Sequence, residues 1–443
     1  MSLRRSLVLG TVGLTAILAA PTVALADSAP AHPQTAQQAA PQKHAPGQIR
    51  QDSLRALGSR TGLRTGTAVD TDLLGSDQEY TDLVNTQFNV VTPENVMKWE
   101  VVEPEQGQYD WSGADELVKS AQRNGQLVRG HNLVWHSQLP TWLSPDGVTS
   151  PFSSDQLKQI LKKHIMDEAG RYKGRIWQWD VVNEAFNDDG TPRQDIWYKA
   201  WGNSTDYIAD AFRWAKQADP GAELFYNDYN IEDSGPKVDA VYGLVTKLKA
   251  QGVPIDGVGF QTHLSTAYGF PNLQEQLQRF ADLGLNVAET EVDVRTSVLA
   301  GTKNTPATGQ LQSVQEAYWD QTLKACLFVQ RCVSSTAWGV GDANSWMPST
   351  FAGEGAALLH DEQLQPKRQY TVVQQDLAPP AGPLRTASRG APAGADRSRT
   401  QGRGRDGGGA PRSSRGAPHR NTRWPGAGSN RRPLAFQASA RTD

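Results

Sequence analysis

The sequence has few cysteines and no long apolar run beyond its first 26 residues. Only two cysteines occur among 443 residues, which excludes a small scaffold held together by several disulfides. No segment after the first 26 residues is long and apolar enough to span a membrane, so we expect no membrane association. The chain also contains no C-x-x-C, H-x-H or H-E-x-x-H motif, and we therefore expect neither a redox pair nor a bound metal.

Glycine-rich phosphate-binding turns are missing from the early part of the chain. No early strand-like segment is followed by G-x-G-x-x-G, and no Walker loop occurs. Such turns hold the phosphates in nucleotide-binding doubly wound sheets. We therefore disfavour that fold, although it also alternates strands with helices, and we expect no cofactor.

Charge is distributed unevenly along the chain. The formal net charge is −3, but residues 385–443 contain 13 Arg, no Lys and three Asp, a net charge of +10. The other 384 residues hold 31 Lys and Arg against 44 Asp and Glu, a net charge of −13. The Arg-, Gly- and Pro-rich tail has too few apolar residues to fold. Such a tail could bind RNA, but an exported protein meets little RNA, so we expect no nucleic-acid partner.

The first residues have the pattern of a secretory signal. Arg4 and Arg5 precede an apolar run at 7–20, and Ala24-Leu25-Ala26 forms a small-x-small cleavage site. A membrane anchor is the alternative, but the run is short and interrupted by Gly and Thr. We predict a secreted, extracellular protein with four parts: a signal peptide at 1–26, an Ala/Pro/Gln-rich leader at 27–49, a folded domain at 50–377 and a disordered tail at 378–443.

The number of cysteines is even, Cys326 and Cys332, and the chain is expected to be exported to an environment where thiols tend to oxidise. We predict a disulfide between them. Because the loop it closes is short, the chain-entropy model gives a stabilisation of only about 2 to 2.5 kcal/mol. The alternative, a redox or nucleophilic pair, lacks the spacing that such pairs use.

Short β-branched or apolar segments alternate with helix-compatible segments between residues 50 and 377. Strands are predicted near 66–69, 89–92, 127–134, 176–182, 223–226, 257–261, 287–290 and 335–338, and helices at 154–171, 206–216 and 273–283. Eight strands alternating with helices predict an α/β fold, the (β/α)8 TIM barrel.

Polar residues follow the predicted strands, where TIM barrels place their active sites. Glu184 follows the fourth strand and Glu291 the seventh. One buried carboxylate is explained equally well by an ion pair at the barrel rim. Two buried carboxylates, on strands that lie opposite each other across the barrel, favour a shared central pocket. Facing carboxyl groups, one protonated near neutral pH and one ionised, are what glycosidic bond cleavage requires.

His263 and Asp293 are candidates to hold the ionised carboxylate by hydrogen bonds. A lone histidine is usually a satisfied core residue, but the alternation of Gln261 and His263 points both side chains to the same side of a strand. Asn183 directly precedes Glu184 and also belongs to this polar group.

Tryptophan is abundant: 13 Trp outnumber 11 Phe. Trp135, Trp338 and Trp346 fall in or just after strand-end positions, where flat indole faces can stack on pyranose rings. Core packing is the alternative, and we assign it to Trp177 or Trp179 and to Trp214 and Trp319.

Seven stretches together resemble family 10 of the glycoside hydrolases, the endo-β-1,4-xylanases, here of the secreted bacterial type. They are TPENVMKWE at 92–100, RGHNLVWHSQLPTWL at 129–143, WDVVNEAF at 179–186, LFYNDYNIE at 224–232, GVGFQTHL at 257–264, VAETEVDVR at 287–295 and WGVGDANSW at 338–346. The resemblance covers residues 50–377 and implies a retaining xylanase on a TIM barrel. Asn132 and Val292 depart from the commonest residues of the family.

The resemblance also implies roles for single residues. Glu184 would be the acid/base and Glu291 the nucleophile, supported by Asn183, His263 and Asp293. Glu94, Asn95, Lys98, His131, Trp135, Gln261, Trp338 and Trp346 would bind the glycone side of a xylan chain, and Tyr229 and Asn230 the aglycone side.

Two other functions are compatible with parts of the sequence. An inactive carbohydrate-binding protein would need one of the two glutamates replaced, and both are present. A metal-dependent barrel hydrolase would use His131, His136 and His263 as ligands. We expect a monomeric xylanase without metal.

Overall fold

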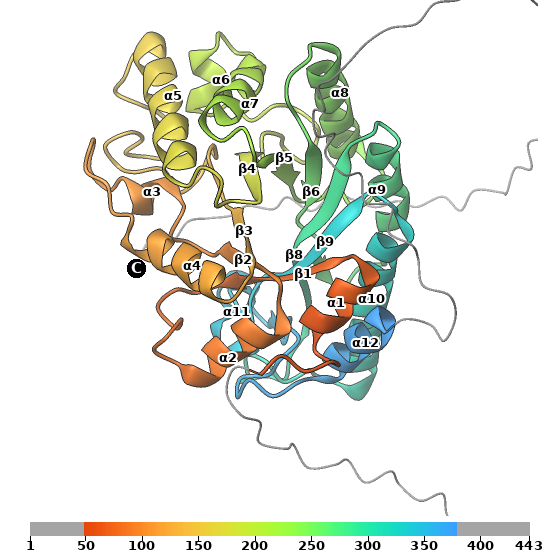
Figure 1. The fold of residues 1–443 in the computed structure, drawn as a ribbon. Coiled ribbons are helices and arrows are strands. Elements are labelled where there is room, and N and C mark those ends of the chain that lie inside the picture. The colour runs from red at the N-terminus through yellow and green to blue at the C-terminus, as the bar shows by residue number, and fades with distance from the viewer. Residues whose placement is uncertain (1–47, 379–443) are drawn as a thin grey trace, which may run out of the picture. The chain divides into compact units, whose positions relative to one another are not determined.

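The computed structural model describes residues 48–378, in which parallel strands form a closed barrel (Figure 1). The barrel strands are β1 (Arg64–Val69), β2 (Val90–Pro93), β3 (Leu127–Gly130), β4 (Gln178–Asn183), β5 (Glu223–Asp228), β6 (Gly257–Phe260), β8 (Asn286–Ser297) and β9 (Cys332–Ala337). Each pairs in parallel with the next, and β9 pairs with both β8 and β1, which closes the ring. The predicted (β/α)8 barrel is confirmed.

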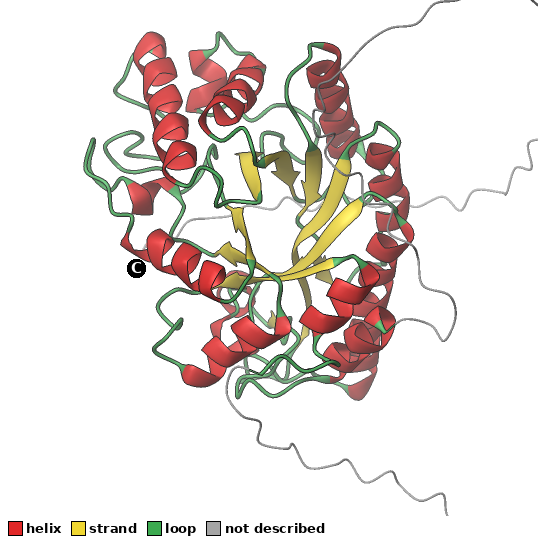
Figure 2. Ribbon diagram, viewed as in Figure 1, coloured by secondary structure: helices red, strands yellow, loops and turns green. Residues whose placement is uncertain are grey.

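Helices surround the strands, as Figure 2 shows. They are α1 (Leu54–Thr61), α2 (Gln78–Gln87), α3 (Trp99–Val102), α4 (Ser112–Arg123), α5 (Ser154–Arg171), α6 (Ile196–Ala200), α7 (Asp206–Ala218), α8 (Pro236–Ala250), α9 (Leu273–Ala281), α10 (Gly309–Phe328), α11 (Met347–Thr350) and α12 (Arg368–Leu377), with a 3-10 turn at Asp342–Asn344. The three predicted helices correspond to α5, α7 and α9.

Helix α5 shows why these segments are helical. Ser153 accepts a hydrogen bond from the backbone N–H of Gln156, and the Gln156 side chain accepts one from the backbone N–H of Ser153, so the two residues form a capping box. Leu157, Leu161 and Ile165 recur at helical spacing and are buried against the barrel.

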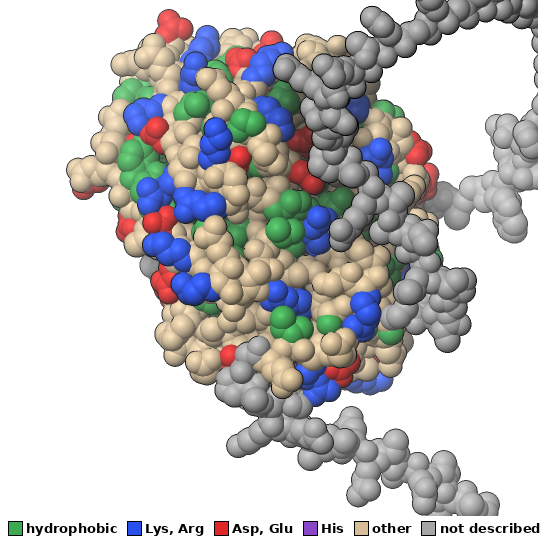
Figure 3. All heavy atoms as spheres, in the orientation of Figure 1, with side chains coloured by type: hydrophobic (Ala, Val, Ile, Leu, Met, Phe, Trp, Pro, Cys, Tyr) green, Lys and Arg blue, Asp and Glu red, His purple; other side chains and the backbone are tan. Residues whose placement is uncertain are grey.

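The outer surface is polar. On the face drawn in Figure 3, Lys and Arg side chains are interspersed with Asp and Glu. Ion pairs at the surface of the described residues include Arg171 with Asp115 at 2.8 Å and Lys247 with Asp206 at 2.9 Å.

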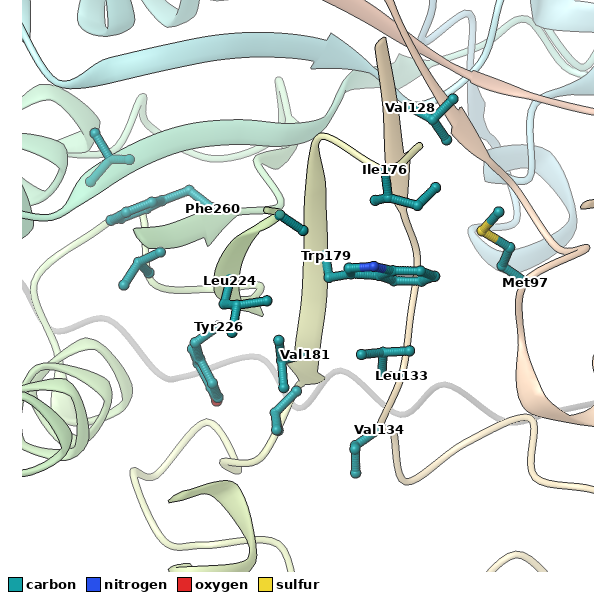
Figure 4. Packing of buried hydrophobic residues seen from close by; sticks show 14 of the residues in the cluster. Met97, Val128, Leu133, Val134, Ile176, Trp179, Val181, Leu224, Tyr226 and Phe260 are labelled. Atoms are coloured by element: carbon teal, nitrogen blue, oxygen red, sulfur yellow. The ribbon is translucent and has the colours of Figure 1, made fainter. Parts of the chain in front are cut away.

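Trp179 of β4 fixes the packing between β3 and β4 (Figure 4). Its indole is fully buried and lies against Gly130 of β3, where a Cβ atom would come within 2.2 Å of the ring. Ile176, Leu133 and Met97 belong to the same buried cluster. Only glycine fits at position 130, so the ends of β3 and β4 are held close together, and these ends carry polar residues of the barrel rim.

Two strands differ most from their predicted bounds, while the bounds of the other six agree to within three residues. Strand β3 ends at Gly130 rather than at 134, because the following chain leaves the parallel register and Leu133 N–H donates to the Asp180 carbonyl. Strand β8 is longer than predicted because its second half pairs with β7 (His263–Ser265) and with β10 (Glu354–Gly355). Glu291 therefore lies within a strand rather than after its end.

The predicted disulfide is present between Cys326 and Cys332, with Cα atoms 5.3 Å apart. Trp179 and Trp319 are buried in the core, and Trp214 packs against it, as predicted. None of the described helices has the length and apolar character needed to cross a membrane. The signal peptide, nearly all of the leader and nearly all of the tail lie outside the described residues, and the predicted domain limits stay predictions.

Candidate active site

Two buried glutamates lie at the carboxyl ends of the barrel strands. Glu184 directly follows β4, and Glu291 lies midway along β8. Their exposed fractions are 9% and 4%. The backbone of Glu184 is left-handed, with a φ of 58°, a conformation that a residue with a side chain keeps only when its surroundings enforce it. Carboxylates buried this deeply need hydrogen-bond donors or positive charge nearby.

Three amide side chains connect the two carboxyl groups. Glu184 Oε1 accepts hydrogen bonds from Asn183 Nδ2 at 3.1 Å and from Gln261 Nε2 at 2.9 Å. Asn227 Nδ2 donates to Glu291 Oε1 and to Asn183 Oδ1, both at 2.8 Å. Asn183 binds Glu184, Asn227 binds Glu291, and the two asparagine side chains are hydrogen-bonded to each other. The two carboxyl groups therefore share one site, as the sequence predicts.

Glu291 is surrounded by donors and positive charge. Arg129 Nη2 lies 3.3 Å from one carboxylate oxygen, and His263 Nε2 lies 3.3 Å from the other. Burial alone would raise the pKa of Glu291, but the hydrogen bond from His263 and the charges of His131 and Arg129 hold this pKa well below its usual range. Glu291 is therefore ionised at neutral pH.

His263 stands between two carboxylates. It lies in β7 directly opposite Asp293 of β8, and its Nδ1 is 2.9 Å from Asp293 Oδ1. Trp346 Nε1 donates to the other oxygen of Asp293 at 2.9 Å. Burial would lower the pKa of His263, but Asp293 and Glu291 outweigh burial and raise this pKa to about 10. The predicted chain from Glu291 through His263 to Asp293 is present in the structure.

Glu184 has no comparable ion pair. Burial raises its pKa, but His136, Gln261, Trp135 and Arg193 bring it below the usual value. This direction is opposite to the expectation that one carboxyl group stays protonated near neutral pH. His136 Nδ1 lies 4.0 Å from Glu184, and burial lowers the pKa of His136 to about 4. His136 is therefore neutral at pH 7, and its contribution to lowering the pKa of Glu184 is absent there.

Comparison with known proteins identifies the family. The model of glycosyl hydrolase family 10 matches residues 53–376. This chain belongs to glycosyl hydrolase family 10. Endo-1,4-beta-xylanase A of Phanerodontia chrysosporium is 43% identical over 307 residues, 69% of this chain and 72% of the relative. Endo-1,4-beta-xylanase B of Thermotoga neapolitana is 37% identical over 325 residues, 73% of this chain and 90% of the relative.

Solved structures of this family have the same fold. The crystal structure of xylanase 10B from Thermotoga petrophila RKU-1 in complex with xylobiose has a TM-score of 0.69 and 38% identity. The alignment covers 75% of this chain and 98% of that chain. The barrel described above is therefore the family 10 barrel.

Several predicted glycone residues of the family 10 site lie close together. Lys98 is buried, and its Nζ donates to Asn95 Oδ1 at 2.9 Å and lies 5.4 Å from the centre of the Trp135 ring. Trp338 meets His131 edge to face, with ring centres 5.3 Å apart. These side chains combine donors with aromatic surface, which is the chemistry that binds sugar rings.

Glu94, Tyr229 and Asn230 have distinct surroundings. Burial raises the pKa of Glu94 to about 7, although the charge of Lys98 opposes this rise. Asn230 has a left-handed backbone with a φ of 54°, and its side-chain amide donates to Asp188 at 3.3 Å. The hydroxyl oxygen of Tyr229 accepts a hydrogen bond from Arg193, in the loop after β4. The structure thus places these residues at the rim of the family 10 barrel, near the loops that follow β2, β4 and β5.

Sequence reasoning missed Arg129, Asp180 and Asn227 as site residues. Arg129 is 1% exposed, forms an ion pair with Asp180 and donates to the carbonyl oxygen of Thr290 at 3.0 Å. All three residues lie in or beside segments predicted as buried strands. A charged or amide side chain at such a position must find a partner across the barrel, and that requirement is the signal that could have identified them.

The structure gives no support to the metal-dependent alternative. Among residues 48–378, the one group of three potential ligands consists of His131, Asp180 and Glu291, whose ligand atoms lie within 4.8 Å of one another. Arg129 already pairs with both carboxylates of this group. The histidines of that alternative face separate carboxylates: His131 faces Asp180, His136 faces Glu184 and His263 faces Asp293.

The raised pKa of His263 predicts a pH dependence of stability. The folded chain holds the imidazolium proton up to about pH 10, whereas the unfolded chain loses it near the usual value of 6.5. Between these values the folded state binds more protons, so the free energy of unfolding falls as pH rises, by at most ~1.4 kcal/mol per pH unit for one proton.

Asp293→Asn removes one of the two carboxylate charges that raise the pKa of His263. We expect the decline in unfolding free energy between pH 6.5 and 10 to become shallower than in the wild type, measured by urea unfolding at several pH values. His360→Asn is the matched control, because burial lowers the pKa of His360 to about 4 and its titration lies outside this window. Equal slopes in wild type and Asp293→Asn would contradict the account.

Proposed function

We propose that this chain hydrolyses internal β-1,4-xylosidic linkages of xylan with retention of anomeric configuration, through a covalent glycosyl-enzyme intermediate. The observation that carries the proposal is the pair of buried carboxyl groups joined by Asn183, Asn227 and Gln261. The relatives named endo-1,4-beta-xylanases and the Thermotoga petrophila structure with xylobiose support xylan as the substrate class.

The first step forms a bond between Glu291 and the sugar. An oxygen of the ionised Glu291 attacks the anomeric carbon while the glycosidic C–O bond breaks, and Glu184 gives its proton to the departing oxygen. His263 and Arg129 hold the attacking carboxylate in place. Because the carboxylate is fixed by donors on both oxygens, its approach to the sugar needs little reorganisation.

The second step reverses the role of Glu184. Ester formation removes the negative charge from Glu291, and the loss of that charge lowers the pKa of Glu184. Glu184 then takes a proton from water, the water oxygen attacks the anomeric carbon, and the ester bond to Glu291 breaks. Two inversions at one carbon give net retention.

The lowered pKa of Glu184 must rise when it acts as the acid. At neutral pH His136 is uncharged because its pKa is about 4, and a sugar placed against Glu184 adds to the burial that already opposes the charged form. Both effects favour the protonated carboxyl group before cleavage. The resemblance to family 10 assigns sugar-binding residues to both the glycone and the aglycone side of the cut, and binding on both sides favours cleavage within the polymer rather than at its end.

The configuration of the first product tests the proposal. Proton NMR of xylo-oligosaccharide hydrolysis should show the β-anomer forming first, with the α-anomer arising later by mutarotation. An α-anomer as the initial product would mean that water attacks directly and that the covalent intermediate does not form. Secretion, the monomeric state and binding of no nucleic acid stay predictions.

A further inference from the structure

The backbone around Glu184 is held in its left-handed conformation by hydrogen bonds from neighbouring elements. Glu184 N–H donates to the carbonyl oxygen of Asn227 at 2.9 Å, and the next N–H, of Ala185, donates to the hydroxyl oxygen of Tyr226 at 3.0 Å. The carbonyl oxygen of Glu184 accepts from Arg193 Nε at 2.9 Å. Of these three hydrogen bonds, the one from Arg193 comes from a side chain in the loop after β4.

Arg193 makes two further contacts. Its Nη2 donates to the hydroxyl oxygen of Tyr229 at 2.6 Å, and its backbone N–H donates to the carbonyl oxygen of Ala185 at 2.9 Å. One guanidinium group therefore binds both the backbone of Glu184 and the tyrosine expected to contact the leaving sugar. A planar guanidinium with donors fixed in two directions can do this, whereas a lysine cannot.

We propose that Arg193 is a positioning residue that couples the acid/base Glu184 to Tyr229, so that the proton donor and the leaving-group subsite keep one fixed geometry. This inference rests on the proposed function and deepens it. A displacement of about 1 Å in such a group costs on the order of 100-fold in rate, so a clamp on the backbone of the proton donor acts directly on the step that needs that proton.

The loop that carries Arg193 is itself fixed. It turns back on itself, with Asn187 N–H donating to the carbonyl oxygen of Thr191 at 2.8 Å. Gly190 at its tip has a φ of 81°, and a Cβ there would come within 2.6 Å of the Pro236 carbonyl oxygen at the start of α8. Lys237 of α8 then lies 3.3 Å from the centre of the Tyr229 ring. The start of α8 therefore lies against both the loop that carries Arg193 and the ring of Tyr229.

Two variants test the coupling through kcat/KM on xylan and on dinitrophenyl β-xylobioside, whose leaving group needs little protonation. Arg193→Met should lose about 10- to 100-fold on xylan and much less on the activated glycoside. Tyr229→Phe, which removes only the hydroxyl group, should show a smaller loss with the same selectivity for xylan. An equal fractional loss on both substrates would overturn the proposal.

The pH dependence of kcat/KM on xylan separates the effect of the Arg193 charge from the effect of its hydrogen bonds. Arg193 is one of the groups that lower the pKa of Glu184, so Arg193→Met should move the alkaline limb of kcat/KM on xylan to higher pH. Arg193→Lys keeps the charge and should leave the limb in place while still losing activity on xylan. An unmoved limb in Arg193→Met would contradict the account.

Arg64→Met is the matched control. Arg64 contacts an aromatic ring, with its guanidinium carbon 4.5 Å from the centre of Trp177, but it lies at the amino-terminal end of β1. It should keep wild-type selectivity between the two substrates. If the wild type itself fails to cleave xylan, the proposed function fails; if the wild type is active and Arg193→Met loses both activities equally, only the coupling fails.

Discussion

Glu291→Ala is expected to lower kcat on xylan by about 10⁵-fold or more, the order of loss that follows removal of a covalent nucleophile. Hydrolysis of the activated dinitrophenyl xylobioside should fall to a similar extent, because a good leaving group does not replace the attacking carboxylate. The measurement is steady-state hydrolysis of both substrates at the pH optimum of the wild type.

A stability control must accompany this variant. Alanine at position 291 leaves the charges of Arg129 and His263 without the carboxylate that lies 3.3 Å from each, and breaking such a buried pair costs about 3 to 5 kcal/mol. Glu291→Gln keeps the shape and an acceptor oxygen and should fold with less loss. A folded Glu291→Gln with full turnover would show that Glu291 is not the nucleophile.

Glu184→Ala is expected to affect the two substrates differently. Loss of the proton donor should lower kcat/KM on xylan by about 10²- to 10⁴-fold. The activated glycoside should keep most of its kcat/KM, since its leaving group departs without a proton. Its kcat should fall, because water then lacks the base that opens the ester with Glu291.

Azide provides the control for Glu184→Ala. A small anion that needs no base can attack the intermediate in the space left by the glutamate side chain, so azide should raise kcat on the activated glycoside and give a β-xylobiosyl azide. Glu184→Gln serves as the matched variant for folding. Equal losses on both substrates without azide rescue would show that Glu184 is not the acid/base.

Sequence patterns could predict side chains that depend on strand position. Glu184 and Glu291 follow from the ends of the fourth and seventh predicted strands, and His263 follows from its alternation with Gln261. The structure places these side chains beside one another, because strand periodicity determines which side of the sheet a residue faces. The barrel closes as predicted, so residues on distant strands share one end.

The partners of those side chains could not be predicted in the same way. Arg129 meets Glu291 across 162 residues of sequence, and no local pattern encodes that pairing. The lowered pKa of Glu184 depends in part on His136, which lies in the loop after β3. The length of β8 depends on β7, which resumes pairing after a break at Gln261 and Thr262. Long-range contacts decide all three features.

The central claim is that Glu291 becomes covalently attached to the sugar. A 2-deoxy-2-fluoro xylobioside with a dinitrophenolate leaving group tests it most directly, because the fluorine slows both steps while the leaving group keeps the first one fast. Mass spectrometry of the inactivated protein should show one fluoroxylobiosyl group per chain, located on Glu291 after proteolysis. Attachment to Glu184 or to any other residue, or inactivation without attachment, would contradict the account.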